Sequence, residues 1–151
     1  MRPIPRNSTS IILLALVGLL SPLSLRAHHA FFAEFDSDAP VRLQGRVTKV
    51  EWINPHAWIH LEVEEEDGPA VTWMVEGGTP NTLLRRGFDK NTLSIGTEIL
   101  VRGYQAKDKG CKPACKANGR DVTFPDGRKL FLGSSGTGAP RDGADPLERP
   151  R

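Results

Sequence analysis

The sequence predicts a mainly β protein, a small OB-like barrel of five to six strands with one short helix between strands three and four. Three observations point to it. Apolar and polar residues alternate in several short segments, which is the period of a half-buried strand. Turn residues separate these segments, and one capped helical segment follows the third. A coiled first strand, two more strands, a helix and further strands is the order of an OB-type barrel, although a partly open sandwich fits equally well.

The first predicted strand follows Pro40, and its apolar pattern changes phase partway along. Its apolar and small positions are Val41, Leu43, Gly45 and Val47, followed by Val50 and Trp52. A change of phase inside one strand is typical of a bulge or a sharp coil, and Gly45 suits such a bend. Asn54 and Pro55 then end the strand, because Pro lacks the N–H that a sheet ladder needs and Asn tolerates turn conformations.

The second and third predicted strands each have one apolar face. Ile59, Leu61 and Val63 alternate with Trp58, His60, Glu62 and Glu64 in the second strand, and Val71, Trp73 and Val75 share a face of the third. Alternation of this kind predicts that only one side of each strand is buried. We therefore expect Trp73 in the core and His60 on the solvent-facing side.

The helix is predicted directly after Gly77 and Gly78. Thr79 suits its N-cap position and Pro80 its first helical position, while Gly87 is a typical helix stop. Leu83 and Leu84 would form its packing face. A strand over residues 97–104, a polar loop that holds both cysteines, and a hairpin of residues 121–124 and 129–132 around the turn 125–128 complete the domain.

The N-terminal part of the chain has the composition of a secretory signal. In residues 1–27, Arg2 and Arg6 precede the apolar run 11–20, and Leu25-Arg26-Ala27 resembles a cleavage site. The run is shorter than the roughly 20 residues of a membrane span. We expect cleavage after Ala27, a periplasmic or secreted protein and no stable membrane span, with an uncleaved anchor as the alternative.

The rest of the chain divides into an arm, a domain and a tail. Residues 28–39 form the N-terminal arm, whose Phe31, Phe32 and Phe35 we expect to dock on the domain, because exposed Phe favours association. Residues 40–133 form the barrel domain. Residues 134–151 are rich in Gly, Ser, Pro and charged residues, a composition that predicts a disordered tail.

The charge balance gives no support for nucleic-acid binding. The chain has 20 Lys and Arg against 18 Asp and Glu, a formal charge of +2. Residues 1–27 hold Arg2, Arg6 and Arg26 and no acid, so their removal leaves 17 basic against 18 acidic residues, a charge of −1. Nucleic-acid-binding domains usually carry a basic face, which this balance does not predict.

The two cysteines of the chain, Cys111 and Cys115, are predicted to form a structural disulfide. Three residues including a Pro separate them, and such a loop brings two Cα atoms within disulfide range. Export places them where disulfides form. A redox pair normally has two intervening residues, and a zinc site needs four ligands, for which the sequence offers no obvious partners.

Four separated motifs resemble the signatures of an exported bacterial domain of unknown function. They lie at residues 28–36 (HHAFFAEFD), 52–58 (WINPHAW), 81–87 (NTLLRRG) and 126–131 (DGRKLF). The resemblance covers roughly residues 27–134 and implies an exported location and a fold. The family has no established activity, so the resemblance implies no chemistry. The segment with Cys111 and Cys115 is unusual for that family.

The segment from Glu51 to His60 is the predicted functional region. Trp52, Asn54, His56 and Trp58 are the candidate ligand-binding residues, because two indoles and a histidine crowd a corner where Gly and Asp are usual. The Trp side chains would give an aromatic platform of the kind that OB surfaces use for bases or sugars. From the sequence alone, Trp52 and Trp58 fit the core and the site equally well.

A copper site is the most specific prediction from the sequence. Cleavage after Ala27 would give His28 a free α-amine, which can chelate an ion together with a ring nitrogen, and His29 or His56 would complete a square. Planar nitrogen sites favour Cu(II). The alternatives are that His28 and His29 lie at a frayed terminus and that His56 only caps the Pro turn.

These features predict an exported, non-enzymatic binding module for a small ligand or a metal ion. The alternatives are a metal-dependent enzyme that uses the same histidines and a purely structural envelope protein. No strand-to-helix elbow positions a nucleophilic Ser, although catalytic sets are recognised by geometry rather than by motif. A pocket that joins His56 to an acid of raised pKa would favour the enzyme.

Overall fold

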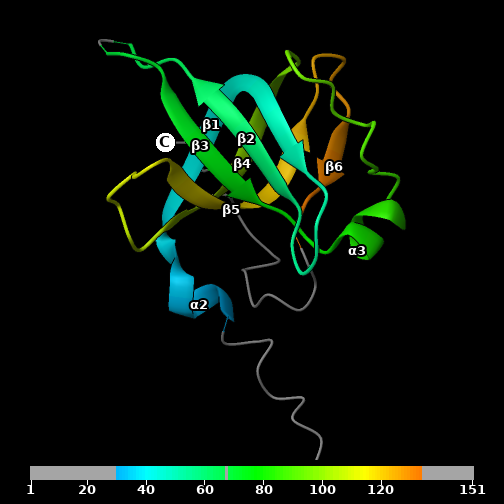
Figure 1. Ribbon diagram of the computed structural model, residues 1–151, viewed down its shortest axis with the longest axis horizontal. Coiled ribbons are helices and arrows are strands. Elements are labelled where there is room, and N and C mark those ends of the chain that lie inside the picture. The colour runs from blue at the N-terminus through cyan, green and yellow to red at the C-terminus, as the bar shows by residue number, and fades with distance from the viewer. Residues whose placement is uncertain (1–29, 67, 134–151) are drawn as a thin grey trace, which may run out of the picture.

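The structure of the protein is a computed structural model that describes residues 30–66 and 68–133 (Figure 1). The predicted signal segment 1–27, the residues His28 and His29, and the predicted tail 134–151 lie outside the described residues. In the described ranges, no helix is both long enough and apolar enough to span a membrane.

The described residues form a mainly β domain, as predicted. Its elements are α2 (Ala30–Glu34), β1 (Phe35–Glu51), β2 (Trp58–Val63), β3 (Val71–Glu76), α3 (Pro80–Leu84), β4 (Glu98–Ala106), β5 (Cys115–Thr123) and β6 (Lys129–Phe131). The sheet order is β3-β2-β1-β4-β5-β6, and an additional parallel pairing of β3 with β5 closes five strands into a ring. The short helix predicted between strands three and four is α3 (Figure 1).

β1 is longer than predicted and is shared between two neighbours. It begins at Phe35, so residues 35–39 of the predicted arm belong to the strand. Residues up to Arg46 pair with β4, and residues from Arg46 onward pair with β2. The predicted change of phase is a register shift between Val47 and Lys49. Gly45 has a different role, since a Cβ there would lie 2.6 Å from the carbonyl oxygen of Glu62.

The core lies inside the ring. Its fully buried members include Val47, Ile59, Leu61, Val75, Val101 and Val122. In β1, β2 and β4 these residues alternate with exposed or half-buried ones, which is the pattern the sequence predicted. Trp73 is also buried, as predicted, but its indole nitrogen has no hydrogen-bond partner among the described residues.

The helix α3 is capped as predicted but packs with one leucine rather than two. The Thr79 hydroxyl accepts a hydrogen bond from the Thr82 N–H at 3.2 Å, and Pro80 is the first helical residue. Leu83 is buried, whereas Leu84 is half exposed, so its predicted packing role was wrong. A helix this short presents only one residue per turn to the core. Gly87 adopts a positive φ of 78° after the helix.

The second half of the chain differs from prediction at β5. β5 begins at Cys115, within the segment predicted to be a loop, because Cys115 pairs with Trp73 of β3 across the ring closure. The predicted hairpin is present, and β5 pairs with β6 from Asp121 to Thr123. Its turn has Gly127 at φ 82°. The predicted disulfide between Cys111 and Cys115 is also present.

A second, smaller core anchors the start of the described chain. Phe31 and Phe35 are buried together with Tyr104 and Ala106 of β4. The Lys107 backbone N–H donates to the carbonyl of Glu34 at 2.9 Å. Two of the three predicted Phe anchors are therefore confirmed. The third was wrong, since Phe32 is half exposed, although its ring lies edge to face with that of Phe31.

Candidate functional site

The corner from Trp52 to Ala57 joins β1 to β2 and is fastened to the end of β3. The Ala57 N–H donates to the carbonyl of Gly78 at 3.1 Å, and the Gly77 N–H donates to the carbonyl of Ala57 at 2.8 Å. These two bonds fix a segment that Pro55 excludes from the sheet ladder. The corner is thus held in one place on the fold, with Asn54 exposed at its tip.

The two indoles of the corner separate into a core residue and a surface residue. The ring of Trp52 stacks on that of Phe88, with centroids 6.1 Å apart and an angle of 10° between the planes, and packs against the main core. Trp58 is half buried on the outer face of β2, because its neighbour Ile59 points inward. Of the predicted aromatic platform, only Trp58 faces outward.

His56 meets two residues that the sequence did not single out. Its Nδ1 lies 3.2 Å from the carbonyl oxygen of Gly77 and 3.6 Å from Oε1 of Glu76. The Asn118 side-chain amide donates to the same Glu76 oxygen at 3.3 Å. Glu76 ends β3 and Asn118 is its register partner in β5, so the pairing that closes the ring also brings them together. We call His56, Glu76 and Asn118 the corner triad.

The corner triad runs from the interior to the surface. Asn118 is 2% exposed, Glu76 is 7% exposed, and the His56 side chain is 28% exposed. Burial raises the pKa of Glu76 above its ordinary 4.5, and the negative charge of Glu34 raises that pKa further. His56 and Asn118 act in the opposite direction. The triad therefore contains an acid whose charged form is disfavoured, beside an imidazole.

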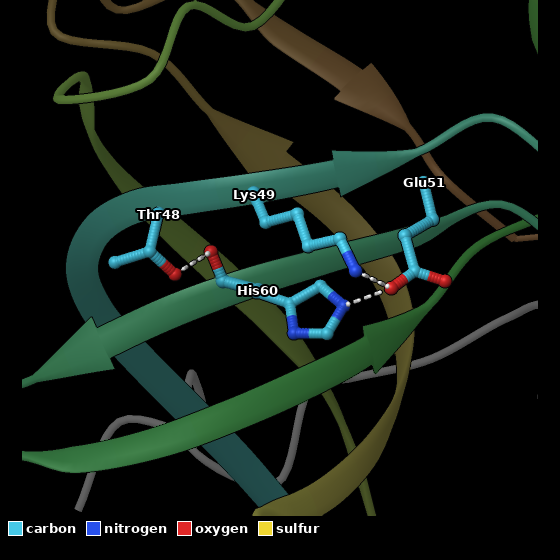
Figure 2. Close-up of polar contacts among 4 residues, drawn as sticks. All are labelled: Thr48, Lys49, Glu51 and His60. Atoms are coloured by element: carbon cyan, nitrogen blue, oxygen red, sulfur yellow. Dashed lines mark hydrogen bonds and ion pairs between the residues drawn. The ribbon is translucent and has the colours of Figure 1, made fainter.

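A second histidine–glutamate pair lies on the outer face of β1 and β2 (Figure 2). His60 Nε2 is 3.0 Å from Oε1 of Glu51, and the Lys49 ammonium lies 2.5 Å from the same oxygen. Thr48 donates from its hydroxyl to the carbonyl of His60 at 3.3 Å. We call Lys49, Glu51 and His60 the outer triad.

The outer triad corrects the prediction that His60 is solvated. The face was predicted correctly, but the His60 side chain is only 14% exposed and bonds to Glu51. Lys49 is directly opposite His60 because of the register shift in β1. The hydrogen bond from Lys49 lowers the pKa of Glu51 below 4.5, and the charges of Lys49 and His60 act in the same direction.

The anchored start of the chain lies on the same side of the sheet as the corner triad. The Phe31 ring meets that of Tyr104 edge to face, with centroids 5.6 Å apart. Tyr104 is the register partner of Asn118, and cross-strand partners share a face. Asn118 in turn bonds to Glu76. A continuous set of contacts therefore leads from α2 to His56.

The predicted copper ligands are described only in part. His56 belongs to the corner triad, whereas His28 and His29 lie outside the described residues. Within residues 30–66 and 68–133, no three His, Cys, Asp or Glu side chains are grouped so that they could hold a metal ion. The copper site stays a prediction.

The fold also has a polar hollow of about 400 Å³ away from the corner. Its lining residues are Gln44, Gly45, Arg46, Glu62, Glu64, Ala70 and Glu98. Sequence patterns do not predict this hollow, because its lining residues come from four separate segments.

The comparisons with known proteins place the chain without assigning it an activity. The sequence model of a family of unknown function, DUF6152, matches residues 19–113. The match includes the arm and the corner and ends before Asn118 and the predicted motif at 126–131. No curated protein matches the chain.

Proposed function

For this chain, which belongs to the family of unknown function DUF6152, we propose the function of an exported binding module. It holds copper at His56 of the corner triad. The proposed ligands are the α-amine and imidazole of His28, the imidazole of His29 and the imidazole of His56. Export is proposed from the signal-like composition of residues 1–27. An OB-type fold is proposed as well, and the β1-β2-β3-β5-β4 ring with α3 between β3 and β4 supports it.

The observation that carries the proposal is the location of α2. Ala30, the first described residue, directly follows His29, and the contacts from Phe31 through Tyr104 and Asn118 lead to the corner triad. Glu34 lies close enough to Glu76 for its charge to raise the pKa of that residue. We therefore propose that the histidines before Ala30 meet His56 on this side of the sheet.

The chemistry of His56 also supports the proposal. A carbonyl oxygen only accepts hydrogen bonds, so the contact with Gly77 places the His56 proton on Nδ1. The lone pair of the neutral ring is then on Nε2. Metal-binding histidines usually donate their second ring N–H to a carbonyl or carboxylate in this way. Phe31 and Phe35 each stabilise the arm by about 1.5–3 kcal/mol through burial, and bound copper would add to that by mass action.

Titration of Cu(II) into matched proteins tests the proposal. A protein that begins at His28 should bind one equivalent, and the same protein with one extra N-terminal Ala should bind at least about tenfold more weakly, since the chelating amine becomes an amide. His56→Ala should weaken binding, whereas the matched variant His60→Ala should not. Equal affinity of the native and Ala-extended proteins would refute the proposed site.

A second candidate function is an enzyme in which Glu76 orients His56 as a general base. The observation that favours it is the contact between an imidazole and an acid of raised pKa, a combination that occurs in active sites. Screening for hydrolysis and oxidation of model substrates would test this function. A turnover that His56→Ala abolishes and His60→Ala leaves intact would favour the enzyme over the binding module.

A further inference from the structure

A row of charged side chains crosses the outer face of the sheet where β1 changes partner. Arg46 is the register partner of Glu62 in β2 and of Glu98 in β4, and it is the one residue of β1 that is paired on both sides. Cross-strand partners share a face of the sheet, which places a guanidinium between two carboxylates. Gln44 and Gly45 have no register partner in β2, and the polar hollow of about 400 Å³ opens beside them.

The charged side chains of this hollow are available to a ligand. Arg46, Glu62, Glu64 and Glu98 line the hollow and are exposed. None of these four side chains forms a hydrogen bond or an ion pair with another described residue. The three acids outnumber the one guanidinium, and a cleft lined mainly by one sign of charge attracts ligand groups of the opposite sign. The hollow therefore offers several acceptors for an ammonium group and one planar donor for a carboxylate.

A second hollow of about 200 Å³ adjoins the first and has an apolar lining. The two hollows share Gln44 and Glu98, and the second is also lined by Leu100, Phe124 and Pro125. Leu100 is the register partner of Gln44 and lies two residues, about 7 Å, from Glu98 along β4. A ligand of the size of an amino acid spans that distance. A charged compartment next to an apolar one fits a ligand that has a charged end and an apolar end.

We propose that the two hollows form one binding site for a free α-amino acid with an apolar side chain. The α-carboxylate of the ligand pairs with the Arg46 guanidinium, whose parallel N–H groups match a carboxylate. The α-ammonium donates to the carboxylates of Glu62 and Glu98. The ligand side chain lies against Leu100 and Pro125. The site shares no residue with the corner triad, so it does not depend on the proposed copper function.

NMR titration of the metal-free protein with matched ligands tests the site. L-Phenylalanine should shift the side-chain amide signals of Gln44 and the methyl signals of Leu100. Glycine keeps the charged groups but has no side chain to bury, so it should bind about tenfold more weakly. Phenethylamine lacks the carboxylate and 3-phenylpropanoate lacks the ammonium, so each should bind about three- to tenfold more weakly than L-phenylalanine.

Two results of this titration would overturn the proposal. One is that L-phenylalanine leaves the signals of Gln44 and Leu100 unchanged up to its solubility limit. The other is that phenethylamine binds as tightly as L-phenylalanine, because the site would then recognise amines rather than amino acids. Neither result bears on the copper function, since no metal is present.

Substitutions that neutralise single charges assign the two ends of the ligand. Arg46→Gln should weaken binding of L-phenylalanine about three- to tenfold. It should not weaken binding of phenethylamine, so this variant should no longer favour the amino acid over the amine. Glu98→Gln should weaken binding of both ligands, because both carry the ammonium. These side chains are exposed, so the variants should keep the fold.

Arg42→Gln is the matched control for Arg46→Gln. Arg42 is exposed on the same face of β1, four residues before Arg46, and lines neither hollow. Its substitution removes the same charge and should leave the affinity for L-phenylalanine unchanged. An equal loss of affinity in the two variants would show a general effect of surface charge and would overturn the assignment of the carboxylate to Arg46.

Discussion

The corner triad and the outer triad use the same two residue types and reach opposite electrostatic states. In the corner triad, burial raises the pKa of Glu76, whereas in the outer triad Lys49 lowers the pKa of Glu51. The histidines also use opposite atoms, since His56 is contacted at Nδ1 and His60 at Nε2. Both contacts involve an acid 3.6 Å or less from the ring, so distance does not separate them.

The difference between the triads lies in the third residue and in solvent access. Asn118 provides one neutral hydrogen bond in the interior, whereas Lys49 provides a full positive charge, with its side chain 60% exposed. A carboxylate at the surface beside an ammonium is stabilised as an ion, whereas for the buried carboxylate the desolvation penalty outweighs the stabilisation from the amide hydrogen bond. The burial of the acid, more than the presence of histidine, therefore decides in which pair the charged form of the acid is disfavoured.

The largest effect is expected from removing the buried donor. Asn118→Ala should destabilise the protein by about 1–3 kcal/mol, because Glu76 loses its hydrogen bond while it stays buried. Urea unfolding at pH 7 measures this. The double variant Asn118→Ala with Glu76→Leu should recover part of the loss, because no buried carboxylate then lacks its donor. If the double variant is less stable than Asn118→Ala by as much as Glu76→Leu alone is less stable than the native protein, the two residues are not coupled.

The pH dependence of stability should come next in size. Glu76 has a raised pKa in the folded state, so its contribution is fully present below 4.5 and is lost as pH rises through the folded-state value. Glu76→Gln should therefore be more stable than the native protein at pH 7 and should show a flatter stability curve above pH 4.5. Urea midpoints between pH 4 and 8 provide the measurement. A native curve that rises over this window faster than that of the variant would contradict the sign.

Glu51 should show the opposite dependence with a smaller amplitude. Its folded-state pKa is lowered, so its contribution is present above 4.5 and is lost as pH falls through the folded-state value. Glu51→Gln should be less stable than the native protein at pH 7, and the two should converge in acid. Thermal unfolding between pH 3 and 6 tests this. A variant that stays equally destabilised at pH 3 would mean that packing, not charge, is responsible.

The smallest effect is expected at Lys49. Exposed ion pairs contribute about 0–1 kcal/mol and are screened by salt, so Lys49→Ala should change stability by less than about 1 kcal/mol. The change should shrink in 1 M NaCl, where the screening length is about 3 Å. A loss that is as large as that of Asn118→Ala, or that does not depend on salt, would remove the contrast between the triads.

Local patterns predicted much of the fold, but they singled out His56 without Glu76 and Asn118, the other two residues of the corner triad. The alternation around Ile59 and Val75 and the Thr79 cap act over a few residues, so they can be read directly from the sequence. His60 was misjudged because its partner Glu51 depends on the register shift in β1, which appears in the sequence only as a change of phase.

Asn118 and Glu76 could not be found in this way. They are 42 residues apart and meet only because β3 and β5 run parallel at the ring closure. Asn118 also lies in a segment without alternation, Cys115 to Gly119, four of whose five residues are buried. The one signal available was the polar residue Glu76 at the end of a strand whose other face is apolar.

The backbone hydrogen bonds of Gly77 and Gly78 determine which segments must separate before the corner can open. The Gly78 carbonyl accepts from the Ala57 N–H and the Gly78 N–H donates to the carbonyl of Leu132, so three distant segments are joined at one residue. Exposing the amide of Gly77 to solvent exchange requires the corner to leave the end of β3, and exposing the amide of Gly78 requires the segment after β6 to leave it. We expect both amides to exchange slowly, because segments that are distant in the chain must separate first. In a hydrogen-exchange experiment, a segment drawn as a loop would then be among the slowest parts of the molecule to exchange.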